Sequence, residues 1–242
     1  MGSIIEVFPG AGAPLRAAPL PGTGTLRTRP ARLEDYAAIR ALQRQAHPGL
    51  AAWTLKQLEN HRRAFPEGQL VADCGGEVVG AASTLILAWD EFLLDRTWKH
   101  VTGDGSFITH EPAGRTLFGA EFVVNVVRHG TGAARALYLA QRRLCRRLNL
   151  RRVIIAARMP GYRACENAMS PETYAQRVVW GDLEDPHLRF ALSLGFQYCG
   201  VIREYLPEDR ESGGNAALLV WLNPLYSPAE PPANVERPRK CA

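Results

Sequence analysis

The stretch RHGTGAAR at residues 128–135 combines small residues with cations in a pattern that suits phosphate binding. It follows the strand-like run RTLFGAEFVVNVV at 115–127 and leads into a helical pattern that continues to about Leu148. The first N–H groups of a helix have no partner within the helix and carry partial positive charge, so they attract anions. Glycines let a phosphate approach the backbone, because a Cβ would fill that space. The strand, the turn and the helix start therefore predict an anion site.

Two common phosphate-binding motifs do not fit this turn. A P-loop requires a lysine after its second glycine, and residues 128–135 contain none. A dinucleotide-binding fingerprint requires glycine where Arg135 stands, and an acidic residue about 20 positions later. The chain has no acidic residue near position 150, so neither a P-loop nor a dinucleotide site is expected.

Basic side chains are concentrated around the same turn. The chain carries 29 Lys and Arg against 24 Asp and Glu, but no acidic residue lies between Phe122 and Cys165, where ten arginines fall. Such a field favours a polyanionic ligand, either phosphate groups or nucleic acid. Four of these arginines lie opposite the apolar stripe of the predicted helix, as on a solvated helix face: Arg142, Arg143, Arg146 and Arg147. The segment lacks interleaved aromatic residues and a recognised binding module, so nucleic acid is not the expected ligand.

The hydrophobic pattern predicts a mixed α/β fold around one central sheet. Strands are expected at 25–31, 69–73, 78–87, 115–127, 151–157, 196–203 and 215–222. Helices are expected at 33–46, after the glycine-rich turn, and after Thr54, Ser170 and Asp185, whose side chains can cap a helix start. Residues 88–113 give no clear assignment. The expected order is β-α-α-β-β-β-α-β-α-α-β-β.

Length and composition indicate a globular chain with loosely held ends. Residues 1–24 are expected to form a flexible arm rich in Gly and Pro, 25–223 a single domain, and 224–242 a C-terminal tail. No apolar run approaches the roughly 18 residues that suggest a membrane span. The five cysteines are odd in number and form no CxxC pair, which indicates neither a metal site nor a disulfide framework. A reducing, cytoplasmic setting is expected.

A third kind of phosphate site accounts for the turn. VVNVVRHGTGAARALY resembles the acyl-CoA loop of the GNAT superfamily of N-acetyltransferases, in which a strand is followed by Gln or Arg, two residues, Gly, one residue, and Gly or Ala at a helix start. In this register His129 takes the first position, Gly132 the fourth and Ala134 the sixth. His129 departs from the usual Gln or Arg, although the neighbouring Arg128 can supply a cation. Val126 stands where a proline is common.

The resemblance extends over about residues 25–223. TRPARLEDYAAIRAL at 28–42 is similar to the opening strand and helix of the superfamily, and LRFALSLGF at 188–196 to its last helix. The similarity is greatest to the acetyltransferase domains found fused to carbon–nitrogen hydrolases, the nitrilase-like amidases. The segments that carry it are GRTLFGAEFVV, RRLNLRRVIIAARMPGY, MSPETYAQRVV and DPHLRFALSLGFQYCGVIREYLPED.

The resemblance implies a GNAT fold, with a mostly antiparallel, splayed central sheet flanked by helices. It also implies acetyl-CoA or another acyl-CoA as cosubstrate, without a metal. The pantetheine arm would lie along the strand that ends near Val126, and the diphosphate would lie on the amides of the turn. The cofactor-binding residues implied in this way are Phe122, Val123, Val124, Arg128, His129, Gly130, Thr131, Gly132, Ala133, Ala134 and Arg135.

The resemblance further implies a catalytic base and an acid. Glu121 occupies a position where many relatives carry a carboxylate that deprotonates the amine, directly or through water; the alternative is a carboxylate that pairs with backbone or an arginine. Relatives often use a tyrosine four residues before the glycine of Leu-Gly-Phe to protonate the CoA thiolate, but Ala191 stands there. Tyr138, Tyr162, Tyr198 or solvent could serve instead, and Tyr138 is the residue we select.

The predicted function is therefore transfer of an acetyl group from acetyl-CoA to a primary amine. The alternative, favoured by Ala191, is a catalytically degenerate domain that binds acyl-CoA and regulates or docks to a partner such as an amidase. The acceptor is expected to be a small-molecule or peptide amine, surrounded by loops at 47–66, 88–113 and 158–184, the second of which contains His110. A homodimer and a carbon–nitrogen hydrolase partner are compatible with the resemblance, whereas a membrane is not expected.

Overall fold

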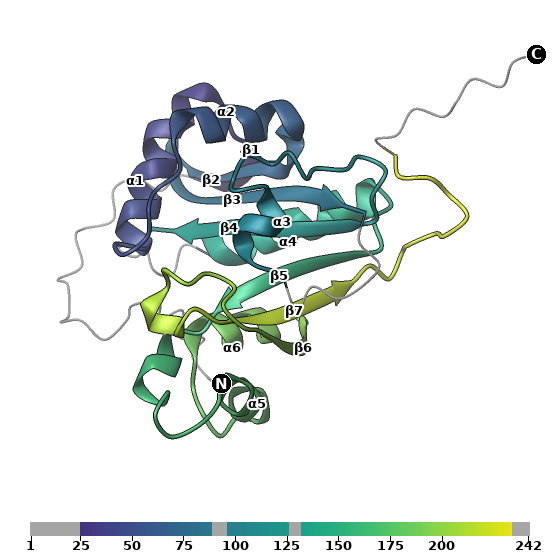
Figure 1. The fold of residues 1–242 in the computed structure, drawn as a ribbon. Coiled ribbons are helices and arrows are strands. Elements are labelled where there is room, and N and C mark those ends of the chain that lie inside the picture. Colours follow the sequence, from purple (N-terminus) through teal and green to yellow (C-terminus); the bar gives the residue numbers. More distant parts are fainter. Residues whose placement is uncertain (1–24, 89–95, 126–131, 234–242) are drawn as a thin grey trace, which may run out of the picture.

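Seven strands form one open sheet. The computed structural model describes residues 25–88, 96–125 and 132–233. The strands are β1 (Leu26–Pro30), β2 (Gln69–Cys74), β3 (Glu77–Leu87), β4 (Thr116–Val124), β5 (Arg152–Arg158), β6 (Gln197–Ile202) and β7 (Ala216–Leu222). They lie in the order β1-β2-β3-β4-β5-β7-β6, and only β4 and β5 run parallel. The predicted mixed α/β fold with a mostly antiparallel sheet is confirmed (Figure 1).

Six α-helices connect and cover the strands. They are α1 (Tyr36–Ala46), α2 (Leu55–Ala64), α3 (Trp98–Thr102), α4 (Ala133–Arg147), α5 (Pro171–Trp180) and α6 (Pro186–Ser193), all in the described residues. The three predicted caps are present, because the side chains of Thr54, Ser170 and Asp185 each accept a hydrogen bond from a first-turn N–H. Local sequence therefore sets these helix starts.

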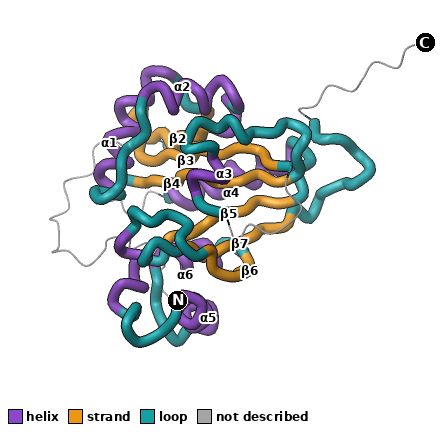
Figure 2. The backbone as a smooth tube through the Cα atoms, in the orientation of Figure 1, coloured by secondary structure: helices purple, strands orange, loops and turns teal. Residues whose placement is uncertain are grey.

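The helices divide between the two faces of the sheet. Buried residues of α1, α2 and α3, among them Ile39 and Leu58, pack with Phe118 on one face. Buried residues of α4, α5 and α6 pack with Leu117 on the other. Figure 1 shows α3 on the near side of the sheet and α4 behind it, and Figure 2 shows the sheet lying between the two helical layers. A ligand on α4 and a ligand on α1 would thus lie on opposite faces.

The structure adds detail in two segments for which the sequence predicted no helix or strand. The unassigned stretch 88–113 contains the one-turn helix α3, which begins after the cap Thr97. The first part of the expected tail packs against the domain, since the Asn149 side-chain amide donates to the carbonyl oxygens of Ser227 and Glu230 at 3.0 and 3.1 Å. Residues 1–24 and 234–242, which belong to the predicted arm and tail, lie outside the described residues.

A buried ion-pair group joins β1, β2 and the start of α1. Arg29 contacts Asp35 at 2.7 Å and Asp73 at 3.0 Å, and both carboxylates are buried. The hydrogen bond from Arg29 lowers the pKa of Asp35, against the opposing effect of burial. The pKa of Asp73 is lowered by the Gly76 N–H, with a further contribution from Arg29. Folding lowers the pKa of both carboxyl groups. The two ionised carboxylates therefore stabilise the fold fully at a pH above their pKa in the unfolded chain, and this contribution is lost as the pH falls through their pKa in the folded protein.

This group predicts a pH-dependent stability. Arg29→Met is expected to lower the free energy of unfolding by about 3 kcal/mol at pH 7. The deficit should begin to shrink as the pH falls below about 4, the unfolded value, and should shrink further as the pH falls through the lowered folded pKa values of Asp35 and Asp73. Urea unfolding at pH 7, 4 and 3 measures this, with the exposed Arg32→Met as control. A deficit that is the same at every pH would contradict the assignment.

Candidate functional site

The parallel strands β4 and β5 separate before either of them ends. Their ladder joins Thr116–Gly119 to Arg152–Ile155 and stops there. Beyond it, β4 continues beside β3 to Val124, and β5 continues beside β7 to Arg158. Figure 1 shows the two strands diverging toward the end of the sheet near α1. The sheet is therefore splayed into a fork with its vertex at Gly119 and Ile155.

A β-bulge at Ala120 turns β4 away from β5. Ser83 of β3 pairs with Glu121 and Thr84 pairs with Gly119, so Ala120 is an extra residue on β4. Such a bulge bends its strand and re-aims the side chains that follow. The indole Nε1 of Trp98 in α3 donates to the Ala120 carbonyl at 3.0 Å, and the Trp98 backbone N–H donates to the Tyr205 carbonyl at 2.7 Å. The segment around α3 thus forms a wall of the site beside Glu121.

Glu121 lies on the α1 face of the sheet, immediately beyond the fork vertex, with 20% of its side chain exposed. Its Oε2 accepts from Gln43 Nε2 at 3.1 Å, and its Oε1 accepts from the Phe122 N–H at 3.0 Å. Gln43 is itself held by the Trp53 N–H, which donates to Gln43 Oε1 at 3.1 Å. The carboxylate is therefore fixed on one edge and still reached by solvent.

A histidine connects Glu121 to a buried ion pair. His47 ends α1, and its Nε2 lies 3.7 Å from Glu121 Oε1. Its Nδ1 lies 2.8 Å from Arg158 Nη1, which can only donate. Nδ1 therefore accepts from Arg158, and Nε2 is the ring nitrogen that faces Glu121. Arg158 also contacts Asp209 at 2.5 Å and Glu211 at 2.9 Å.

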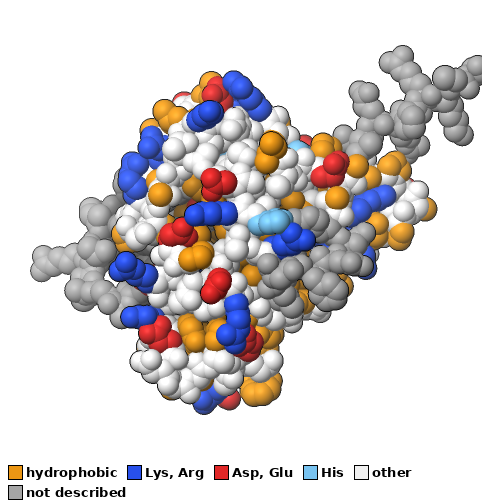
Figure 3. Space-filling view, in the orientation of Figure 1, with side chains coloured by type: hydrophobic (Ala, Val, Ile, Leu, Met, Phe, Trp, Pro, Cys, Tyr) orange, Lys and Arg blue, Asp and Glu red, His pale blue; other side chains and the backbone are white. Residues whose placement is uncertain are grey.

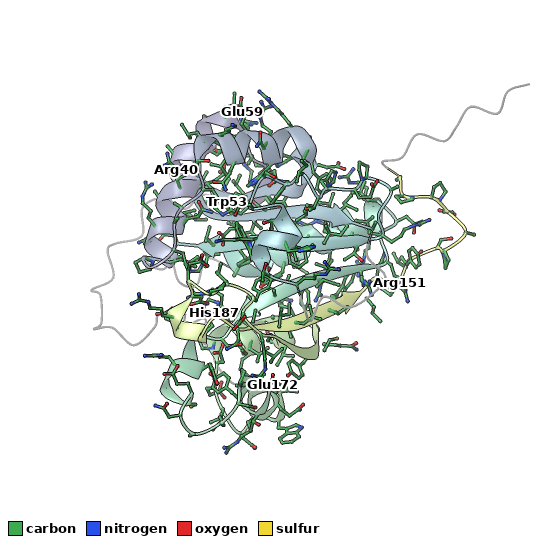
Figure 4. The ribbon with its side chains drawn as sticks, viewed as in Figure 1. Arg40, Trp53, Glu59, Arg151, Glu172 and His187 are labelled. Carbon is green, nitrogen blue, oxygen red and sulfur yellow. The ribbon has the colours of Figure 1, made fainter. Side chains whose placement is uncertain are left out.

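Charges in this group perturb the pKa values of its members. Burial alone would lower the pKa of Arg158, but Asp209 and Glu211 raise it. Burial alone would raise the pKa of Asp209, but Arg158 lowers it. Burial, and then Arg158 and His47, lower the pKa of His187 to about 3, so that His187 is neutral at pH 7. Figure 4 shows Trp53 and His187 on opposite sides of the fork.

The α4 end of the predicted site lies on the opposite face. Gly132 begins α4 with φ +73°, in the left-handed region that favours glycine. Among the described residues, a Cβ on Gly132 would approach only Leu26, at 4.0 Å. Ala133 and Ala134 are buried in the first turn, Ala133 in the same hydrophobic cluster as Val124 at the end of β4, while Arg135 is exposed. Arg128, His129, Gly130 and Thr131 lie outside the described residues.

The predicted β4 residues face both sides of the sheet. Phe122 and Val124 pack against the α4 layer, and Val123 is buried in the α1 layer. Glu121 and the first turn of α4 are thus brought to the same end of β4 but to opposite faces. A ligand that contacts both Glu121 and the first turn of α4 must therefore pass between β4 and β5 at the fork.

The tyrosine selected from sequence lies beneath the fork. The ring of Tyr138 on α4 stacks on Phe122 with centroids 4.3 Å apart, and Phe190 of α6 lies 6.0 Å away. Burial raises the pKa of Tyr138, so its hydroxyl holds its proton firmly and is a weak acid toward a thiolate. Ala191, where relatives often have a tyrosine, is fully buried in α6. The role of Tyr138 stays a prediction.

Several other expectations are changed by the structure. His110 does not lie beside Glu121: its Nδ1 accepts from the Ile86 N–H at 3.1 Å near the other end of β4, and its ring stacks on Phe65. The arginines of α4 are not simply solvated. Arg142 and Arg146 lie over the ring of Trp221, and Arg142 donates to the Leu194 carbonyl.

The remaining α4 arginines make polar contacts as well. Arg143 donates to Thr28, and Arg147 pairs with Glu67 at 2.6 Å. On the face that carries α3, basic and acidic side chains are interspersed (Figure 3). The described arginines of α4 thus take part in intramolecular contacts, although Arg143, Arg146 and Arg147 stay exposed.

Four residues of the Glu121 group were not predicted from the sequence: Gln43, His47, Arg158 and Asp209. The separations of these residues in the chain explain why, because Gln43 is 78 residues from Glu121 and Arg158 is 51 residues from Asp209. The sequence indicated only His47 as a candidate, because it lies in the loop 47–66 that was predicted to surround the acceptor. In the described residues, no cluster of three or more His, Cys, Asp or Glu side chains could hold a metal ion. None of the described helices is both long and apolar enough to cross a bilayer.

Two curated proteins of Bacillus subtilis (strain 168) are similar to the chain over most of its length. The "Probable hydrolase YhcX" is 34% identical over 197 residues, which are 81% of this chain and 38% of YhcX. The "Uncharacterized N-acetyltransferase YkwB" is 32% identical over 177 residues, which are 73% of this chain and 78% of YkwB. The chain thus spans about two fifths of the first relative and over three quarters of the second. No family model matches the sequence.

Solved structures share the fold. A GNAT-like decarboxylase, GphF, in complex with isobutyryl-CoA superposes with a TM-score of 0.70 at 24% identity, over 81% of this chain and 99% of GphF. The loading GNATL domain of CurA from Lyngbya majuscula also gives 0.70, at 18% identity, over 82% of this chain and 98% of the domain. At these identities the likeness concerns the fold alone.

Proposed function

The chain belongs to the GNAT superfamily of N-acetyltransferases, and on that basis we propose that it transfers the acetyl group of acetyl-CoA to a primary amine. The observation that carries the proposal is the fork between β4 and β5. It connects the start of α4 on one face to a fixed, solvent-reached carboxylate on the other. An acyl thioester that enters from the α4 face would therefore meet an amine on the Glu121 face.

In the proposed reaction, Glu121 accepts a proton from the acceptor ammonium, directly or through water. An amine with a pKa near 10 is almost entirely protonated at pH 7 and cannot attack a thioester until it loses that proton. Gln43 and the Phe122 N–H orient the carboxylate. The neutral amine then attacks the carbonyl carbon, and the C–S bond breaks to release CoA thiolate. Tyr138 or solvent supplies the proton that the thiolate takes up.

The cosubstrate is proposed to bind along the inner edge of β4 and at the start of α4. Its diphosphate would be held by the amides of Gly132–Arg135, together with the preceding turn, and Arg135 would add positive charge. Its pantetheine arm would lie along Phe122–Val124. GphF, a protein with the same fold, is in complex with isobutyryl-CoA, which supports an acyl-CoA as the ligand.

A second function is a catalytically degenerate domain that binds acyl-CoA and docks to a carbon–nitrogen hydrolase. It is favoured by the buried Ala191 at the usual tyrosine position and by the similarity to YhcX, of which this chain matches only part. Calorimetry with acetyl-CoA and CoA, followed by thiol release over a panel of amines, separates the two functions. Binding without thiol release on any amine would favour docking, and absence of CoA binding would contradict both.

The acceptor is proposed to be a small-molecule or peptide amine. Within the GNAT superfamily, the chain is proposed to belong to the acetyltransferase domains that accompany nitrilase-like amidases. We propose a cytoplasmic location, since the five cysteines are odd in number and form no CxxC pair. A homodimer stays a prediction that sedimentation would test.

The turn at the start of α4 offers a direct test of CoA binding. Gly132→Ala is expected to weaken CoA binding about tenfold or more, because the new Cβ occupies the space into which the diphosphate fits. Gly181→Ala is a matched control: Gly181 ends α5 with φ +90°, and the nearest atom to its Cβ would be Arg189 Nη1 at 3.8 Å. Both variants should lose about 1–2 kcal/mol of stability from backbone strain. Only Gly132→Ala should lose affinity in calorimetry, and equal affinities would contradict the site.

A further inference from the structure

A glutamine is buried beneath the fork with its amide unpaired. Gln141 lies in the middle of the apolar stripe of α4 and is 1% exposed. Neither its Nε2 nor its Oε1 has a hydrogen-bond partner among the described residues. An unpaired buried polar group costs about 1–3 kcal/mol, and such groups in native proteins are rare enough to require an explanation. An apolar residue would pack here at no such cost.

The place of this amide coincides with the fork vertex. On the α4 face of β4, Leu117 and Phe122 carry large side chains, while Gly119 between them has none. A Cβ on Gly119 would meet Ile155 Cγ2 at 2.9 Å and Gln141 Nε2 at 3.9 Å, so the amide lies beside Ile155 at the last rung of the β4–β5 ladder. The next residue along β4, Ala120, is the bulge at which the strands part.

The lengths of two backbone segments relate the side-chain amide of Gln141 to the proposed acyl-CoA. From Gly132 to Gln141, α4 rises about 13.5 Å at 1.5 Å per residue. From Val124 back to Gly119, β4 covers about 16 Å at about 3.3 Å per residue. Val124 packs against the hydrophobic cluster that contains Ala133 and Leu137 of the first turns of α4, so the two paths begin in one cluster, and they end together at Gln141. An extended arm anchored at the start of α4 and laid along β4 reaches Gln141 just before it crosses the sheet.

We propose that Gln141 binds the pantetheine arm of the acyl-CoA through the amide nearest the sulfur. This inference rests on the proposed function. The pantetheine amide has an N–H donor and a carbonyl acceptor. These are the partners that Gln141 Oε1 and Nε2 lack among the described residues. The contact is made by free CoA and acyl-CoA alike. Gln141 is thus a binding residue that holds the thioester at the fork, and it takes no part in the bond changes.

The test is Gln141→Met, which keeps the length of the side chain and removes its polar atoms. CoA, acetyl-CoA and adenosine 3′,5′-bisphosphate, which lacks the arm, are titrated by calorimetry against wild type and variant. We expect CoA and acetyl-CoA to bind about tenfold more weakly to the variant and the bisphosphate to bind equally. Leu144→Met, in the same buried stripe, is the control and should leave all three affinities unchanged.

Thermal unfolding of the ligand-free protein gives a second measurement. Here the variant should be more stable than wild type, although it binds CoA more weakly. Gln141→Met removes two unpaired buried groups, so its melting temperature should rise by about 2–4 °C or more. A residue with a merely structural role would lose stability and affinity together. Gln141→Leu serves as the second apolar variant should the methionine protein not fold.

Other outcomes would overturn the inference. Unchanged CoA affinity in the variant would refute the contact while leaving the proposed function intact. A loss confined to acetyl-CoA would move the contact to the acyl group, and a loss shared by the bisphosphate would indicate a displaced helix. A wild-type protein that binds none of the three ligands would refute the proposed function and this inference with it.

Discussion

Replacing Glu121 with glutamine is expected to lower kcat/KM for the amine acceptor by about 100- to 1,000-fold at pH 7. The amide keeps an oxygen that can accept from Gln43 or the Phe122 N–H, so the β4 strand should keep its conformation. It cannot take up the proton of the acceptor ammonium. Binding of acetyl-CoA should change by less than about twofold, because Glu121 lies on the α1 face, away from the start of α4.

The pH dependence of this deficit identifies its cause. As the pH rises toward the acceptor pKa near 10, the amine loses its proton in solution and no longer needs a base. The variant should therefore approach the wild-type rate at high pH, measured by thiol release at pH 7, 8, 9 and 10. Glu211→Gln is the control, since Glu211 pairs with Arg158 in the same charged group and is more exposed than Glu121, and its rate should stay near wild type. A deficit that persists unchanged to pH 10 would rule out the base role.

Asp209→Asn is expected to lower the free energy of unfolding by about 3–5 kcal/mol. Asp209 is 2% exposed, and its two oxygens pair with Arg158 Nε and Nη2. Loss of the carboxylate charge leaves a mostly buried guanidinium without its main counter-ion, and removing one partner of a buried pair is far more damaging than removing a surface pair. Urea unfolding measures the change.

A double-mutant cycle separates the pair from its surroundings. Arg158→Met combined with Asp209→Leu should cost less than the sum of the two single changes, because neither charge is then left unpaired. Glu166→Gln breaks the surface pair with Arg163, 2.6 Å apart, and should cost less than about 1 kcal/mol. Additive costs for Arg158 and Asp209 would show that the two side chains do not stabilise one another.

Much of the fold could be predicted because its signals are local. Thr54, Ser170 and Asp185 mark helix starts by bonding to N–H groups two or three residues away, and each of these caps is present. The run at 115–127 predicts the strand β4, and the apolar stripe of α4 predicts the face that packs on the sheet. The segment 88–113 gave no assignment, because α3 is a single turn whose place depends on Trp98 reaching Ala120 and Tyr205.

The site could be predicted only in part. The sequence determined by itself the glycine at the start of α4, the strand before it and Glu121 within that strand, because neighbouring residues specify backbone conformation. Only the tertiary structure decided that Glu121 meets Gln43 and His47, that Arg158 occupies His47 Nδ1, and that Gln141 lies beneath the fork. These contacts join residues far apart in the chain. They depend on the strand order and on the bulge at Ala120, which arise from the packing of the whole sheet against both helical layers.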